Sequence, residues 1–128
     1  MNPKDRLIIA LDVDSREKAL GLAGKLESDV KFFKVGLELF SSCGPSIVTE
    51  LKNKGCGIFL DLKLHDIPNT AAKTASSLAG LGVFMFNVHA IGGYDMMKKT
   101  AEEVKRKADA LKIERPKILA VTVLTSMD

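Results

Sequence analysis

The sequence predicts an α/β fold in which strands and helices alternate along a parallel sheet. Short runs rich in β-branched and aromatic residues alternate with longer segments of helical periodicity, a pattern typical of repeated βα units. The 128 residues are 46% hydrophobic and 27% charged, as in an ordinary globular domain. We therefore expect residues 1–128 to belong to a single domain.

Five strands and four helices are expected to follow one another in turn. The strands are expected at residues 7–11, 31–35, 57–62, 83–88 and 117–123, and the helices at residues 15–26, 45–54, 69–81 and 94–111. Asp14 and Ser15 can cap the first helix, and Pro45 suits the first turn of the second. Pro68 prevents the third helix from beginning earlier than about its own position.

The polar residues at the strand ends distinguish two possible architectures, an open doubly wound sheet and a closed barrel. The turn after the first strand, residues 11–14, lacks the GxGxxG motif of a doubly wound nucleotide-binding sheet. Instead, every strand leads into polar side chains, which is how a barrel builds its active site. These residues are Asp12, Lys34, Asp61, Lys63, His89, Thr125 and Ser126. We therefore expect a (β/α)8 TIM barrel, of which only about the first five strands and four helices are present, in a chain that is truncated.

Composition and charge argue against several classes of function. The net charge of +3 arises from 19 basic and 16 acidic residues that are intermixed, so we expect no nucleic-acid partner. The apolar run at residues 7–11 is too short for a signal peptide or a membrane span, so we expect a cytoplasmic protein with no membrane partner. Cys43 and Cys56 form no CxxC pair, and we expect reduced, packed thiols.

The segment at residues 59–70, FLDLKLHDIPNT, is the most informative. Because side chains alternate across a strand, Asp61 and Lys63 are expected on one face. Lys34 ends the preceding strand, and neighbouring parallel strands lie about 4.8 Å apart, so Lys34 can reach Asp61. With Asp66 in the following loop, these residues form a predicted charge network. Such a network is costly to desolvate, and its position at a barrel mouth favours a functional interpretation.

Two other features have simpler explanations than a ligand site. His65 and His89 lack a third ligand at a recognisable spacing, so we expect no metal, and a structural hydrogen bond for His89. Gly92 and Gly93 are expected to form a plain loop between a strand and a helix rather than a phosphate-binding turn.

Five segments in this order and spacing resemble the orotidine 5'-phosphate decarboxylase family of the bacterial type. They are LIIALDVD, KVGLELF, FLDLKLHDIPNT, NVHAIGG and AVTVLTS. The resemblance covers essentially the whole chain and corresponds to the first five strands of the family's barrel. It implies decarboxylation of orotidine 5'-phosphate to UMP, the last step of de novo pyrimidine biosynthesis, without metal or cofactor.

The resemblance also implies roles for individual residues. Lys63 would donate the proton to C6 of the pyrimidine and, as a cation, stabilise the carbanion that forms there. Asp61 would lie beside the substrate carboxylate, and Lys34 would hold both Asp61 and a ribose hydroxyl. Asp12 would bind another ribose hydroxyl.

A homodimer is implied as well, because Asp66 and Thr70 would act in the active site of the neighbouring subunit. Thr125 and Ser126 match the fifth-strand segment that contacts the pyrimidine. The residues that grip the phosphate would lie in later parts of the barrel.

Two other functions stay open at this point. One is a magnesium-dependent sugar-phosphate decarboxylase or aldolase of the same barrel group; Lys34 argues against it, because those relatives carry an acidic residue there and Mg²⁺ needs oxygen ligands. The other is an inactive half-barrel that serves as a binding or assembly module, with exposed strand edges that invite pairing.

Overall fold

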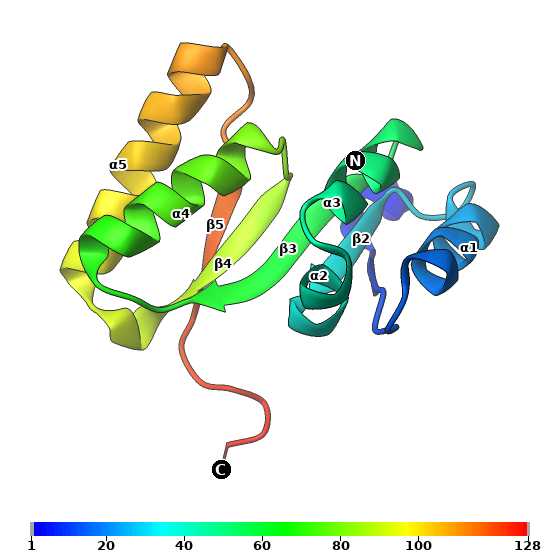
Figure 1. Cartoon of the computed structure of the whole chain (residues 1–128), viewed down its shortest axis with the longest axis horizontal. Coiled ribbons are helices and arrows are strands. Elements are labelled where there is room, and N and C mark those ends of the chain that lie inside the picture. The colour runs from blue at the N-terminus through cyan, green and yellow to red at the C-terminus, as the bar shows by residue number, and fades with distance from the viewer. Residues whose placement is uncertain (1, 128) are drawn as a thin grey trace. The chain divides into compact units, whose positions relative to one another are not determined.

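The computed structural model describes residues 2–127 and contains a five-stranded parallel sheet with the strands in chain order (Figure 1). The strands are β1 (Ile8–Ala10), β2 (Phe32–Gly36), β3 (Gly57–Leu64), β4 (Met85–His89) and β5 (Lys117–Val121). The chain divides into two compact units, Met1–Asp61 and Leu62–Asp128, and the division falls inside β3. The predicted α/β fold class is therefore confirmed.

Unit 1 packs its helices around an apolar core. Its helical segments are η1 (Pro3–Arg6), α1 (Arg16–Leu26), α2 (Leu37–Cys43) and α3 (Ser46–Asn53). Ser15 caps α1 by accepting a hydrogen bond from the backbone N–H of Lys18 at 3.3 Å, as the sequence predicts. Phe33 and Ile58 face each other in the register of β2 and β3, and both are fully buried. This apolar pairing fixes which residues reach the carboxyl ends of the strands.

Helix α2 was not predicted, so unit 1 has two α-helices between β2 and β3 where the sequence indicates one. The helix begins at Leu37, directly after β2, and Gly36 precedes it without a side-chain cap. It ends at Gly44, whose φ of 73° suits glycine and whose N–H bonds the carbonyl of Phe40 at 2.7 Å. A seven-residue helix without a capping residue leaves little signal in a sequence.

Unit 2 is organised around the contact between α4 (Pro68–Gly80) and α5 (Tyr94–Leu111), which lie side by side (Figure 1). Helix α4 begins at Pro68 and ends at Gly80, one residue earlier at each end than the predicted residues 69–81, and α5 has the predicted bounds. A short η2 (Ala90–Gly92) precedes α5. The buried face of α4 consists mainly of alanines, which allow the helices to approach closely.

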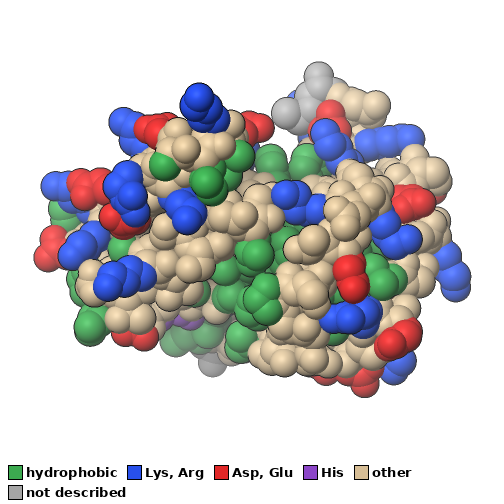
Figure 2. All heavy atoms as spheres, turned by 45° about the horizontal axis from the view of Figure 1, so that its top comes forward, with side chains coloured by type: hydrophobic (Ala, Val, Ile, Leu, Met, Phe, Trp, Pro, Cys, Tyr) green, Lys and Arg blue, Asp and Glu red, His purple; other side chains and the backbone are tan. Residues whose placement is uncertain are grey.

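The surface carries both signs of charge. On the face shown in Figure 2, basic and acidic side chains are interspersed rather than collected into one stripe. Within residues 2–127, no helix is long and apolar enough to cross a membrane.

Candidate active site

Lys34 lies between two carboxylates at the carboxyl ends of β1, β2 and β3. Its Nζ is 3.4 Å from Oδ1 of Asp12 and 3.4 Å from Oδ2 of Asp61. The side chain of Asp61 is 13% exposed and that of Asp12 is 73% exposed. The predicted contact between Lys34 and Asp61 is therefore confirmed, and it is the better shielded of the two ion pairs.

Gly36 leaves room for the Lys34 ammonium group. A Cβ atom at this position would lie 3.3 Å from Nζ of Lys34. The glycine ends β2, and its register partner is Asp61. The absence of a side chain at the strand end thus lets the lysine fold over toward its carboxylate partners.

Lys63, two residues after Asp61 in β3, has an unusual backbone conformation. Its φ is 52°, in the left-handed region that residues other than glycine rarely adopt. Such a conformation costs about 1–3 kcal/mol and persists only where the surroundings hold it. The simple alternation that we used to assign Asp61 and Lys63 to one face assumes an extended φ throughout, and this assumption fails at Lys63.

Asn87 in β4 is a site residue that the sequence reasoning missed. Its Oδ1 accepts a hydrogen bond from the backbone N–H of Lys63 at 2.8 Å. The residue is only 3% exposed and lies between Phe86 and Val88, which are also buried. A polar residue in the middle of a buried strand was the available signal, because such a group is expected to have a hydrogen-bonding partner.

The loop and helix that follow β3 expose Asp66 and Thr70. Asp66 accepts a hydrogen bond from the backbone N–H of Ile67 at 2.7 Å, and Thr70 is exposed in the first turn of α4.

The two histidines of the chain lie close together, with the ring centroids of His65 and His89 5.6 Å apart. The structure thus gives His89 a ring contact with His65, and the expected hydrogen bond of His89 stays a prediction. Among residues 2–127, no group of three or more histidine, cysteine, aspartate or glutamate side chains is arranged to hold a metal ion.

Thr125 and Ser126 lie farther from their strand than the sequence predicts. Strand β5 ends at Val121, and its register partner His89 is the last residue of β4. Without a partner strand, the next residues leave the ladder despite their high β-propensity. Thr125 and Ser126 are exposed in a turn closed by a hydrogen bond from the N–H of Met127 to the carbonyl of Leu124 at 3.0 Å.

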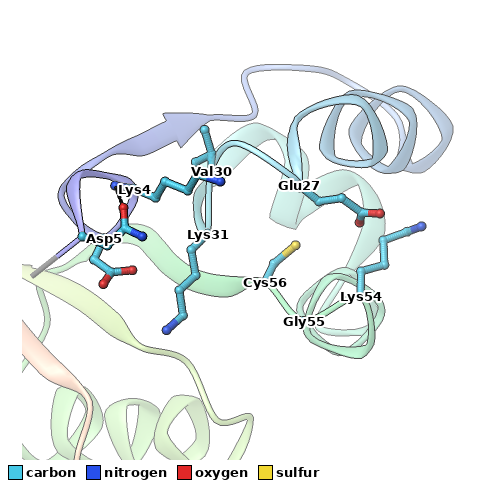
Figure 3. Close-up of a pocket in the computed structure, with 9 residues that line it drawn as sticks. Lys4, Asp5, Glu27, Val30, Lys31, Lys54, Gly55 and Cys56 are labelled. Carbon is cyan, nitrogen blue, oxygen red and sulfur yellow. Dashed lines mark hydrogen bonds between the residues drawn. The ribbon is translucent and has the colours of Figure 1, made fainter.

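A separate cavity in unit 1 lies at the opposite ends of the strands (Figure 3). Its lining includes Val30 and Lys31, which precede β2, and Cys56, which precedes β3. Burial, and secondarily the carboxylate of Glu27, raises the pKa of the Cys56 thiol. Cys43 and Cys56 are both free. The cavity therefore contains a protonated thiol rather than an activated nucleophile.

An α/β chain with charged side chains at the carboxyl ends of its parallel strands is of the class that builds active sites at that edge of the sheet. The model of the orotidine 5'-phosphate decarboxylase / HUMPS family matches residues 5–128. The chain belongs to this family.

Curated relatives and a solved structure agree with this assignment. Orotidine 5'-phosphate decarboxylase of Syntrophomonas wolfei is 54% identical over 127 residues, which are 99% of this chain and 53% of the relative. The enzyme of Carboxydothermus hydrogenoformans is 52% identical and shares 97% of this chain and 51% of its own length. The crystal structure of the Lactobacillus acidophilus enzyme matches with a TM-score of 0.86 and 44% identity, over 95% of this chain and 55% of that one. The chain thus spans about half the length of these relatives.

Proposed function

We propose that this chain carries the first part of an activity that decarboxylates orotidine 5'-phosphate to UMP, and we call a form extended to the length of the relatives the full-length form. The proposal rests on family membership and on one geometric observation in particular. That observation is the placement of Lys34 within 3.4 Å of both Asp12 and Asp61 at the carboxyl ends of their strands. We expect the protein to act in the cytoplasm, where cysteines stay free.

The reaction requires one proton and no redox cofactor. The bond between C6 and the carboxylate carbon breaks, CO2 leaves, and the electron pair stays on C6. The ammonium group of Lys63 then transfers a proton to C6. Before that transfer, its positive charge stabilises the carbanion, and electrostatic stabilisation of this kind is commonly the largest contribution to catalysis.

Asp61 and Lys34 have supporting roles in this scheme. Asp61 lies beside the substrate carboxylate, and the ion pair with Lys34 orients the Asp61 side chain. Lys34 and Asp12 bind ribose hydroxyls, for which the exposed Asp12 carboxylate has the necessary acceptor atoms. Thr125 and Ser126 contact the pyrimidine.

The assay that tests the function follows the loss of orotidine 5'-phosphate absorbance in the presence of EDTA. The full-length form should be active, Lys63→Ala should lower kcat on the order of 10³-fold or more, and residues 1–128 alone should show little or no activity. Lys105→Ala, on the exposed face of α5, is the matched control and should leave the rate unchanged. A full-length form that is inactive in EDTA but converts a sugar phosphate with magnesium would contradict the proposal.

The proposed assembly is a homodimer in which Asp66 and Thr70 reach the active site of the partner. Both residues are exposed. The neighbouring side chains of Ile67, Ile91 and Tyr94 are 67%, 80% and 72% exposed, respectively. Large exposed apolar side chains next to functional groups favour an interaction surface.

Mixing two inactive variants tests this assembly. Dimers of Lys63→Ala with Asp66→Ala contain one intact site if Asp66 acts across the interface. Random reassociation should then recover about a quarter of the wild-type activity, because half of the dimers are mixed and each has one intact site of two. Recovery of no activity, with mixed dimers shown to form, would place both residues in the same subunit's site.

A further inference from the structure

We propose that Asn87 is a positioning residue that holds the backbone of Lys63 in the conformation that catalysis uses. This inference rests on the proposed role of Lys63 in decarboxylation. Its structural basis is the hydrogen bond of 2.8 Å from the Lys63 N–H to Oδ1 of Asn87, together with the φ of 52° at Lys63.

The conformation of Lys63 has no ordinary local cause. Among residues 2–127, the other positive φ outside glycine belongs to Lys112, which ends α5 in the left-handed conformation that is common at helix ends. Lys63 instead lies inside β3, one residue before its end. A strand favours extended backbone at every position. A contact from outside the strand must therefore stabilise the positive φ of Lys63.

Asn87 is suited to provide that contact. It lies in β4 between Phe86 and Val88, which are 0% and 1% exposed. Residues 2–127 contain one other buried polar side chain, that of Thr100 in α5. A buried amide is tolerated where its oxygen and nitrogen are hydrogen-bonded, and an oxygen that accepts from a main-chain N–H fixes the orientation of that peptide unit.

The backbone angle at Lys63 determines where its ammonium group can reach. The direction of the Cα–Cβ bond relative to the strand follows φ, so a return to extended φ would turn the whole side chain. Positioning errors of about 1 Å at a reacting group can cost 10²-fold in rate. Asn87 therefore influences the chemical step through Lys63 without itself touching the substrate.

Three full-length variants separate positioning from simple stabilisation. Asn87→Leu has a similar shape but lacks the acceptor, Asn87→Asp keeps an oxygen acceptor, and Thr100→Val removes the other buried polar side chain. We expect kcat to fall on the order of 10²-fold in Asn87→Leu with little change in KM. Activity should be partly rescued in Asn87→Asp and nearly unchanged in Thr100→Val. Rates are expressed per folded molecule, as measured by circular dichroism.

A second measurement reports on Lys63 directly and needs no turnover. The three-bond coupling between the N–H and Hα of Lys63 and the exchange rate of its amide proton are measured by NMR in each variant. Asn87→Leu should change the coupling and accelerate exchange at Lys63, and Thr100→Val should do neither. A native coupling and native kcat in Asn87→Leu, or equal losses in all three variants, would overturn the inference. Absence of decarboxylation in the wild type would instead remove the proposed function, while the NMR comparison would still decide whether Asn87 holds Lys63.

Discussion

At the scale of single residues, the ammonium group of Lys34 forms ion pairs with two carboxylates that differ in exposure. Lys34 is 23% exposed and contacts the shielded Asp61 and the open Asp12 at the same distance of 3.4 Å. Exposed ion pairs contribute little to stability because water screens them, whereas removing a partner from a shielded charge is costly. The pair with Asp61 therefore maintains the local geometry, and the pair with the exposed Asp12 is the easier of the two to break, as the proposed binding of a ribose hydroxyl by Asp12 requires.

The two cysteines should differ in reactivity. The raised pKa of Cys56 means a smaller thiolate fraction at any pH below it, so alkylation should be slow near neutral pH and accelerate as the pH rises toward that pKa. Iodoacetamide rates from pH 7 to 10 in Cys43→Ser and Cys56→Ser variants measure each thiol alone. We expect the partly exposed Cys43 to react severalfold faster than Cys56 at pH 8.

A control in denaturant should bring the two thiols to similar rates, because unfolding removes the burial that raises the Cys56 pKa. Equal rates in the folded protein would show that Cys56 is not protected.

The single residues also show which contacts a sequence can predict. The contact of Lys34 with Asp61 follows from parallel register and strand spacing alone, and it was predicted. The positive φ of Lys63 could not be predicted in this way. Backbone propensities assign the left-handed region to glycine and asparagine rather than to lysine. Asn87 acquires its role only when β4 places its amide beside β3.

At the scale of elements, α4 and α5 contact each other along their lengths. Four of the five buried residues of α4 are alanines, and α5 buries Met96, Thr100, Val104 and Ala108. Small side chains allow a helix to approach its neighbours closely. The exposed Asp66 lies in the loop before α4, and the exposed Thr70 and Tyr94 lie in the first turns of α4 and α5.

Helix α5 ends at a position that glycine would suit better. Lys112 has φ 55° and ψ 44°, and its N–H bonds the carbonyl of Asp109 at 3.3 Å. A side chain in this conformation costs roughly 1 kcal/mol or more. Lys112→Gly should therefore stabilise the protein by about 0.5–1 kcal/mol in urea unfolding.

A substitution of lysine by glycine in the interior of α5 is the control. Lys105→Gly introduces glycine where the backbone is helical, and it should destabilise the protein by about 1 kcal/mol. Opposite signs for the two substitutions would support the assignment of Lys112 as a left-handed helix end. Destabilisation by both would contradict it.

Element boundaries were predicted where the sequence contains a local signal. Ser15 and Pro68 mark the starts of α1 and α4 correctly. Helix α2 lacked such a signal, and the predicted end of β5 was wrong because it depends on where β4 stops. A strand ends with its partner, and that information is absent from the strand's own residues.

At the scale of the whole molecule, β1 and β5 are the outer strands of the sheet. Side chains on both are exposed although they are apolar, with Ile8 at 37% and Leu119 at 47%. An edge strand with unpaired backbone groups and apolar side chains is a template for association with another chain. The barrel predicted from the strand-end residues would cover such edges, and the solved relative that matches this chain is about twice as long.

The exposed edge predicts that the 128-residue polypeptide self-associates in isolation, and that β5 contributes to this association. Leu119→Lys should shift sedimentation-velocity profiles toward smaller species at a given protein concentration, because a charge on an edge strand opposes pairing. Leu111→Lys is a matched control, since Leu111 is 48% exposed against 47% for Leu119 but lies at the end of α5. If both substitutions reduced association equally, general hydrophobicity rather than the strand edge would be its cause. If neither substitution reduced association, the edge of β5 would not be the surface through which the isolated chain associates.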